Sequence, residues 1–363
     1  MTIRKIRVAV LFGGKSAEHE VSLQSARNVI EALDKDKYEI VPIGIDKEGR
    51  WLLAEPSNFL LNSNDPKLIR LNSSSRSVAV VPQSAGALME LASRRETAPI
   101  DVFFPVLHGP FGEDGSIQGL LKVADVPFVG SGVLGSAVSM DKDVAKRLFR
   151  DAGIPIADFI AVRRGETVSH TEISGKLGTP VFVKPANLGS SVGVHKVTSE
   201  SELAAALADA FAYDTKVMIE QAIVGREIEV SVLGNEDPIA SLPGEIVPRH
   251  EFYSYEAKYI DEHGAVLEIP ARLPEGIVAH LQKLAVLAFR VAGCEGMARV
   301  DFFLQQDGTA LVNEVNTIPG FTSISMYPKL WEASGLPQPQ LLDRLIELAI
   351  ARHKRDAALK TSR

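Results

Sequence analysis

Two short acidic segments near the C-terminus have the residue types and the spacing that a metal site needs. Arg299-Val300-Asp301 and Glu314-Val315-Asn316 flank Asp307-Gly308, a dipeptide that strongly favours a β-hairpin. If Asp307 and Gly308 form a two-residue turn, Asp301 lies opposite Glu314 and Arg299 lies opposite Asn316. Because side chains alternate along a strand, all four then point to one face of the hairpin.

Two carboxylates directly opposite each other repel, so something must compensate for Asp301 facing Glu314. Their oxygens and the amide oxygen of Asn316 form a hard ligand set that suits Mg²⁺, which usually serves substrate phosphates. The alternative is a solvated face with a salt bridge to Arg299. Apolar residues on the other face of the hairpin favour the metal site, and a one-residue shift of register would remove it.

Groups that could hold those phosphates precede the hairpin in the chain. Lys184 ends an apolar strand, and it either points inward or extends along the sheet edge to solvent. The segment 189–193 is either a lid whose backbone N–H groups contact phosphate oxygens or a plain hairpin turn. The segment 220–223 ends another strand and could offer backbone hydrogen bonds to an adenine edge. The residues themselves leave these alternatives open.

Two glycine motifs point to other chemistry but lack the context that it requires. Residues 189–193 match the G-x-S-x-G of hydrolases, which needs a helix after the serine, whereas 192–197 indicates a strand. Residues 130–135 match G-x-G-x-x-G, but they follow the fourth strand and no acidic residue stands at the required distance. The second motif therefore indicates a tight turn that leads into a helix.

Composition excludes several classes of protein. The 363 residues include 39 Lys and Arg against 46 Asp and Glu, and a formal charge of −7 argues against a nucleic-acid-binding face. We find no apolar run long enough to cross a bilayer and no signal peptide, so we expect a cytoplasmic protein. Cys294 is the only cysteine, and we expect it to be a buried thiol without a catalytic role.

Hydrophobic periodicity predicts an α/β protein, and the length of 363 residues predicts two or three domains. Strands that alternate with helices indicate a parallel N-terminal sheet, with an irregular excursion at 51–99; these strands are Lys5–Phe12, Tyr38–Ile45, Asp101–Leu107 and Val126–Val129. A second set of strands follows, at Phe159–Val162, Val181–Lys184, Val192–Val197, Val217–Gln221 and Glu227–Leu233. Helices are expected at Asp141–Phe149, Glu200–Phe211 and Glu275–Val291, and two more follow the final hairpin.

Taken together, the motifs resemble those of the ATP-grasp superfamily and, more closely, of the D-alanine–D-alanine ligases. They occur in order along nearly the whole chain: 11–22 (LFGGKSAEHEVS), 107–115 (LHGPFGEDG), 183–193 (VKPANLGSSVG), 255–259 (YEAKY), 299–301 (RVD) and 313–322 (NEVNTIPGFT). Each motif alone is unspecific, whereas the set is highly specific.

The resemblance implies three domains: a Rossmann-like parallel-sheet domain at 1–138, a central domain at 139–225 and a C-terminal domain at 226–363, with ATP between the last two. ATP would phosphorylate the carboxylate of one D-alanine, and the amine of a second would attack the acyl phosphate. The product would be a dipeptide for peptidoglycan precursors. The family further suggests a homodimer, and the charge and apolar run lengths given above predict no nucleic-acid or membrane partner.

The resemblance also assigns residues to roles. Those at the nucleotide would be Lys142 and Lys184 on the phosphates, with Glu220, Gln221, Ile223, Glu227, Phe252 and Lys258 around ATP. Those on two Mg²⁺ (or Mn²⁺) ions would be Asp301, Glu314 and Asn316. Those at the amino acids would be Glu18 on the first ammonium, Arg299 and the Gly320 N–H on the oxyanion, and Ser325 on the second carboxylate. Ser190 and Tyr259 would bond to Glu18 and are candidate proton acceptors.

Some features leave alternatives open. Gln221 stands where many relatives have lysine, and Tyr259 matches the dipeptide-forming branch rather than the branch that makes an ester with D-lactate. Glu18 could instead cap the helix that begins near Val21, and His108 could be a turn residue. The other functions that we consider are another ATP-grasp carboxylate–amine ligase, a G-x-S-x-G hydrolase and a non-catalytic amino-acid-binding module.

Overall fold

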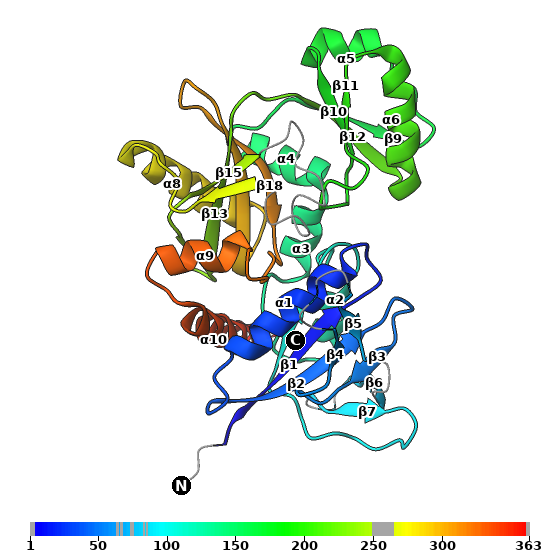
Figure 1. Ribbon diagram of the computed structural model, residues 1–363, viewed down its shortest axis with the longest axis vertical. Coiled ribbons are helices and arrows are strands. Elements are labelled where there is room, and N and C mark those ends of the chain that lie inside the picture. The colour runs from blue at the N-terminus through cyan, green and yellow to red at the C-terminus, as the bar shows by residue number, and fades with distance from the viewer. Residues whose placement is uncertain are drawn as a thin grey trace.

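The fold contains three larger β-sheets, and helices pack against each of them (Figure 1). The structure is a computed structural model that describes residues 4–62, 65, 68–72, 76–82, 84, 86–248 and 265–360. The first sheet forms the N-terminal unit, the second stands apart at the opposite end, and the third lies between them beside α3 (Val133–Met140) and α4 (Lys142–Asp151).

The N-terminal sheet has the order β7-β6-β3-β2-β1-β8. Its parallel centre is formed by β1 (Ile6–Gly13), β2 (Tyr38–Ile45) and β8 (Val102–Val106), with α1 (His19–Ala32) after β1 and α2 (Ser116–Val123) after β8. Residues 8–12 of β1 are fully buried, as expected for a parallel strand that is covered on both faces. The predicted parallel α/β unit is therefore confirmed.

The predicted fourth strand at Val126–Val129 is wrong. Only a single bridge joins Phe128 to Phe103, because Pro127 has no N–H to continue a ladder. Two backbone bonds, Phe103 N–H to Pro127 O and Val129 N–H to Phe103 O, hold the segment beside β8.

The excursion at 51–99 extends the parallel sheet with antiparallel strands. These are β3 (Trp51–Leu53), β6 (Arg76–Val80) and β7 (Leu88–Glu90), while β4 (Leu60–Leu61) and β5 (Arg70–Leu71) form a separate ribbon. β3 pairs with β2, so the excursion begins as a direct continuation of the sheet.

The central sheet is antiparallel, with the order β11-β10-β12-β9. Its strands are β9 (Phe159–Arg163), β10 (Val181–Pro185), β11 (His195–Val197) and β12 (Lys216–Gln221), with α5 (His170–Leu177) and α6 (Glu200–Tyr213) packed against them. The prediction of a strand from Val192 is wrong at its start, because Gly193 and the two serines before it have positive φ. These residues form the turn that joins β10 to β11.

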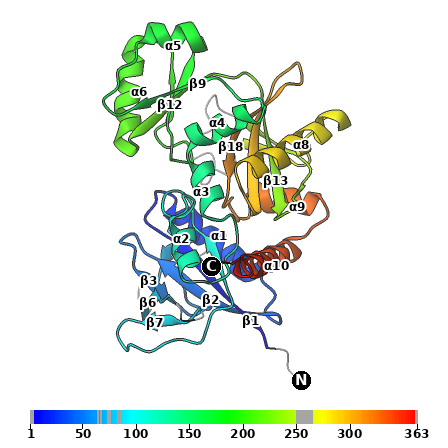
Figure 2. The same cartoon turned by 180° about the vertical axis from the view of Figure 1, so that it is seen from behind.

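The C-terminal sheet follows the order β16-β15-β13-β17-β18, and β14 (Ile239–Ala240) pairs with β13. The other strands are β13 (Arg226–Gly234), β15 (Gly244–Pro248), β16 (Ala265–Glu268), β17 (Gly296–Leu304) and β18 (Ala310–Asn316). Helix α8 (Glu275–Val291) packs on this sheet, and α9 (Met326–Ala333) and α10 (Gln338–Ala357) end the described fold. Helix α10 returns to pack beside the N-terminal unit, as Figure 2 shows from behind.

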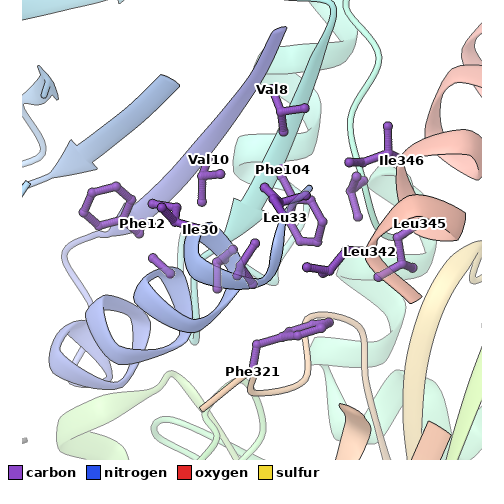
Figure 3. Packing of buried hydrophobic residues seen from close by; sticks show 14 of the residues in the cluster. Val8, Val10, Phe12, Ile30, Leu33, Phe104, Phe321, Leu342, Leu345 and Ile346 are labelled. Carbon is purple, nitrogen blue, oxygen red and sulfur yellow. The ribbon is translucent and has the colours of Figure 1, made fainter. Parts of the chain in front are cut away.

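One hydrophobic cluster joins the two ends of the chain. Side chains of β1, α1 and β8 pack with α10 and with Phe321, which lies in the loop after β18 (Figure 3). The Phe321 ring is fully buried and meets the ring of Phe104 edge to face, with centroids 6.2 Å apart. This contact anchors the C-terminal loop to the N-terminal unit.

Replacing Phe321 with alanine should therefore weaken the joint between the two units. We expect Phe321→Ala to lower the free energy of unfolding by about 3–5 kcal/mol, because it leaves a cavity in the shared core. Urea unfolding followed by circular dichroism would measure the change. Phe111, a residue that is 57% exposed, provides the matched control, and Phe111→Ala should change the free energy of unfolding by no more than about 0.5 kcal/mol. Equal effects of the two substitutions would contradict the assignment.

Candidate active site

The β17–β18 hairpin places the predicted ligands as expected. Arg299 pairs with Asn316, and Asp301 pairs with Glu314, so this part of the predicted register is confirmed. The predicted two-residue turn is wrong. Gln305 N–H bonds to Thr309 O at 2.9 Å, which leaves residues 306–308 as a three-residue turn with Gly308 at φ 88°.

A β-bulge restores the register beyond that turn. Phe302 pairs with Val312 and Asp301 with Glu314, so Asn313 is an extra residue in β18. The bulge brings Asn313 to the cavity wall next to Glu314, where its Oδ1 lies 3.5 Å from Lys184 Nζ. Lys142 Nζ lies 3.3 Å from Glu314 Oε2. A lysine from α4 and a lysine from β10 therefore reach the C-terminal half of β18.

Arg299 balances part of the acidic charge on this face. Its guanidinium bonds both oxygens of Asp301, at 2.7 and 2.6 Å, and its Nε lies 3.0 Å from Glu229 Oε2. The Asn316 amide donates to Asp301 Oδ2 at 3.0 Å. Glu229, which pairs with Asp301 in the β13–β17 ladder, was missed by sequence reasoning. Its alternation with buried Ile228 and Val230 was the available signal.

The donor chemistry of the hairpin suits a divalent cation. Asp301 and Glu314 are directly opposite carboxylates, and Asn316 adds an amide oxygen at the next position on the same face. Across the residues with described positions, no group of three His, Cys, Asp or Glu could hold a metal ion. A site here would thus depend on two carboxylates and an amide, a sparse set that leaves positions for water and phosphate.

Lys184 points inward, as the first of its two interpretations predicts. Its buried ammonium group lies 2.6 Å from Glu220 Oε2, and the other oxygen of Glu220 pairs with Lys146 of α4. Burial alone would raise the pKa of the Glu220 carboxyl, but the charges of Lys146 and Lys184 hold it below its ordinary value. Lys146 was missed by sequence reasoning, because the α4 pattern alone does not show which lysine faces the sheet.

The other residues expected around the nucleotide lie in three places. Gln221 ends β12, Ile223 follows in the connection to β13, and Glu227 lies near the start of β13, where it lines the cavity described below. Phe252, Lys258 and Tyr259 lie outside the described residues.

Glu18 marks the N-terminal side of the site. It occupies the N-cap position of α1, yet its side chain makes no capping hydrogen bond, so the capping alternative is not supported. Ser190 Oγ donates a hydrogen bond to Glu18 Oε1. Ser191, the serine of the G-x-S-x-G pattern, lies in the same turn between two antiparallel strands rather than before a helix, which is not the context of a hydrolase nucleophile. The N-terminal unit and the central sheet therefore meet at this carboxylate.

His108 and Glu113 join the N-terminal unit to the loop after β18. His108 is buried, and burial lowers the pKa of its imidazole to about 4, so the ring is neutral at pH 7. Its Nδ1 donates to Ile318 O at 3.0 Å, which leaves Nε2 to accept from the Ser25 hydroxyl at 3.1 Å. Glu113 Oε2 accepts from Gly109 N–H at 2.7 Å, and Oε1 accepts from Ile318 N–H at 3.3 Å.

Burial and the negative charge of Glu18 raise the pKa of the Glu113 carboxyl to about 8. Glu113 was not among the predicted site residues, although it lies inside the motif at 107–115. His108 faces this network rather than acting as a plain turn residue.

Gly320 and Ser325 form the far side of the site. A methyl group on Gly320 would lie 2.7 Å from Ser325 Oγ, so only glycine leaves this position open. Ser325 Oγ accepts from Thr322 N–H at 2.9 Å and lies 2.8 Å from Thr322 Oγ1. The hydroxyl at the start of α9 is therefore held beside the Gly320 backbone.

One cavity of about 360 Å³ collects these groups. It is lined by nine of the predicted residues: Glu18, Ser190, Glu227, Arg299, Asp301, Glu314, Asn316, Gly320 and Ser325. A cationic and acidic wall from the C-terminal sheet thus faces Glu18 from the N-terminal unit, with Ser190 from the central sheet beside it. Such a site can hold a zwitterion between a carboxylate and an arginine.

Family comparisons cover most of the chain. Residues 7–131 match the model described as D-ala D-ala ligase N-terminus, and residues 148–347 match D-ala D-ala ligase C-terminus. The chain belongs to the D-alanine–D-alanine ligase family. It is a ligase of the ATP-grasp fold, as the sequence motifs predict.

Individual relatives agree with this assignment. A D-alanine–D-alanine ligase from Oceanobacillus iheyensis is 55% identical over 99% of both chains. The solved D-alanine–D-alanine ligase of Coxiella burnetii has a TM-score of 0.87 at 41% identity and covers 98% of this chain and 97% of its own. A D-Ala:D-Ser ligase from Enterococcus faecalis has a TM-score of 0.84 at 39% identity and covers 95% of this chain and 100% of its own. The Bacillus anthracis D-alanine–D-alanine ligase complexed with ATP has a TM-score of 0.72 at 30% identity and covers 97% of this chain and 99% of its own.

Two findings outside the cavity concern the remaining expectations. Cys294 is buried with its Sγ 3.4 Å from Ser139 Oγ, and burial raises the pKa of the thiol to about 11, as expected for an unreactive cysteine. None of the helices in the described ranges is both long and apolar enough for a bilayer.

The buried Lys146–Glu220–Lys184 cluster should be sensitive to loss of its one carboxylate. We expect Glu220→Gln to lower the free energy of unfolding by about 3–5 kcal/mol, because two buried ammonium groups lose their counter-charge. Urea unfolding would measure this, with the exposed Glu200→Gln as a control that should change little.

A comparison of wild type with Glu220→Gln at different pH values also tests the cluster. The folded-state pKa of Glu220 lies below its ordinary value of 4.5, so the ionised carboxylate stabilises the fold above that pH. This contribution is lost as the pH falls through the lowered folded-state value. The difference between wild type and Glu220→Gln should therefore shrink in acid, and a constant difference would count against the assignment.

Proposed function

We propose that this enzyme uses ATP and Mg²⁺ to join two D-alanine molecules through a D-alanyl phosphate, for peptidoglycan precursor synthesis. The observation that carries the proposal is the single cavity that gathers Glu18, Arg299, Gly320 and the two facing carboxylates from different units of the fold. The neighbour solved with ATP supports the choice of nucleotide.

The first step activates a poor electrophile. A carboxylate does not react with an amine, so one carboxylate oxygen of the first D-alanine attacks the terminal phosphorus of ATP and ADP leaves. Glu18 would hold the ammonium of that D-alanine, and Arg299 would attract its carboxylate. Lys142 and Lys184 would neutralise phosphate oxygens from the side of α4 and β10.

Asp301, Glu314 and Asn316 would hold the divalent ions of the family, Mg²⁺ or Mn²⁺. Bound there, the ions would screen the negative charge of the phosphates during transfer. Arg299, now bonded to Asp301, would also face the cavity from the same strand. The negative charge of this face would therefore be balanced partly by the divalent ions and partly by the permanent positive charge of Arg299.

The second step forms the peptide bond. The amine of the second D-alanine attacks the acyl carbon, phosphate leaves with the electrons of the broken C–O bond, and the amine loses a proton. Arg299 and the Gly320 N–H would stabilise the oxyanion of the tetrahedral intermediate. Ser325 would bind the second carboxylate. The proton would pass to Ser190, which already bonds to Glu18, or to Tyr259.

The domain limits, the homodimer and a cytoplasmic location stay predictions of the family resemblance. A different ATP-grasp carboxylate–amine ligase is the second candidate. It is favoured by one observation, the similarity to a D-Ala:D-Ser ligase, which leaves the acceptor to be identified.

The substrate can be tested with the purified enzyme, ATP and Mg²⁺. We expect phosphate release that depends on D-alanine and not on L-alanine. With the ammonium on Glu18 and the carboxylate at Arg299, the two enantiomers direct the methyl group to different parts of the cavity wall, and this third contact would select one of them. Mass spectrometry should show the D-alanine dipeptide as the main product when D-alanine, D-serine and D-lactate compete. Predominant ester or mixed dipeptide would refute the choice of acceptor, and no release with any amino acid would refute the ligase.

The metal site can be tested through the acid on β18. We expect Glu314→Gln to raise the Mg²⁺ concentration for half-maximal phosphate release by about 10-fold or more. Replacing even a residue that only hydrogen-bonds to a metal ligand typically weakens metal binding by about 10- to 100-fold. Asp307→Asn in the exposed turn of the same hairpin is the control and should leave the Mg²⁺ dependence unchanged. An unchanged Mg²⁺ dependence in Glu314→Gln would remove this residue from the metal site.

A further inference from the structure

The loop after β18 is held at two residues by side chains of the N-terminal unit. His108 Nδ1 donates to Ile318 O, and Glu113 accepts from Ile318 N–H. Three residues later, Ser25 Oγ accepts from Phe321 N–H at 3.2 Å, and the Asn28 amide donates to Phe321 O at 3.0 Å. Both backbone groups of both residues are therefore bonded across the boundary between the two units.

Gly320 lies between these two fixed residues. Residue 319 is proline and has a restricted backbone, so the path from Ile318 to Phe321 has little freedom once its ends are held. The Phe321 ring is buried in the N-terminal core, which fixes the same end by packing (Figure 3). The direction of the Gly320 N–H is thus set largely from outside the C-terminal sheet.

Glu113 also contacts the opposite end of the cavity. Its second oxygen holds Gly109 N–H, and a methyl group on Gly109 would lie 2.6 Å from Glu18 Oε2. Gly109 is therefore enclosed by the two carboxylates. One side chain connects the segment beside Glu18 to the segment that carries Gly320.

We propose that Glu113 is a positioning residue that sets the spacing between Glu18 and the Gly320 N–H, with Ser25 as its partner at the far end of the loop. The inference rests on the proposed function, in which these two groups hold the ammonium and the oxyanion of one amino acid. Glu113 itself acts through backbone groups. The N-terminal unit thereby positions an oxyanion donor that belongs to the C-terminal unit.

The chain offers matched variants for a test. Above the raised pKa of Glu113, where both of its oxygens are acceptors, Glu113→Gln keeps the shape of the side chain but turns an NH₂ group toward one of the two N–H donors. Asp114→Asn is its control, because Asp114 also accepts two N–H bonds, from Phe111 and Ser116, but both donors lie within three residues of it in the chain. Ser25→Ala removes the acceptor of Phe321 N–H. Ser22→Ala is its control, one turn earlier on α1, where Ser22 is equally buried and bonds Gly13 and Val106.

The measurement separates kcat, the KM for D-alanine, and ATP affinity by calorimetry without D-alanine. We expect Glu113→Gln and Ser25→Ala each to lower kcat by about 10- to 100-fold, as small misplacements of a catalytic group do, and to raise KM for D-alanine while ATP affinity is kept. Asp114→Asn and Ser22→Ala should keep wild-type kcat and KM. Since Ser25→Ala tests the same loop from another element, it decides the question if Glu113→Gln does not fold.

Two results would overturn the inference. Wild-type kcat and KM in both test variants would show that the loop needs no such support, and equal losses in the control variants would show a general effect on folding. A wild-type enzyme without D-alanine-dependent phosphate release would instead overturn the proposed function, and the inference with it.

Discussion

The repulsion between two carboxylates that face each other across β17 and β18 is the constraint to which the rest of the cavity responds. Asp301 and Glu314 lie in direct register, and Glu229 adds a third acid on the neighbouring strand. Arg299 contacts two of these acids, and Lys142 approaches the third. An apolar wall could not hold such charges without counter-ions. The cationic side chains, and the divalent ions of the proposed mechanism, thus all balance the negative charge that this arrangement of strands brings together.

Placing these groups requires three separate units to meet. β10 brings Lys184 and α4 brings Lys142 and Lys146, while the turn after β10 carries Ser190 to Glu18. The ion pairs of Glu220 with Lys146 and Lys184 connect α4 to the central sheet. Because these contacts cross between elements distant in sequence, they order the cavity only in the folded protein. Charge that would destabilise an isolated sheet here helps to connect the units.

Much of the fold and the main site were predictable from sequence, because alternation in strands and the Asp-Gly turn constrain the hairpin. The facing of Asp301 and Glu314 was nevertheless predicted through two local errors that cancel, since the turn has one residue more and β18 has a bulge at Asn313. The bulge follows Val312, whose N–H bonds to Pro155 O in a distant segment. Periodicity cannot show such a contact, nor that Lys146 or Glu113 would meet partners from other units.

The same reasoning explains why the C-terminal loop belongs physically to the N-terminal unit. A loop of the C-terminal sheet that ended in solvent would leave the N–H of Gly320 free to reorient. Instead the side chains of His108, Glu113 and Ser25 bond the loop on either side of Gly320. Burial keeps His108 neutral by lowering its pKa, so that Nδ1 donates to the loop while Nε2 accepts from Ser25. A preorganised N–H needs no rearrangement when negative charge develops beside it. In the proposed mechanism, the boundary between the two units would both enclose the amino acid and orient the N–H group that stabilises its reaction.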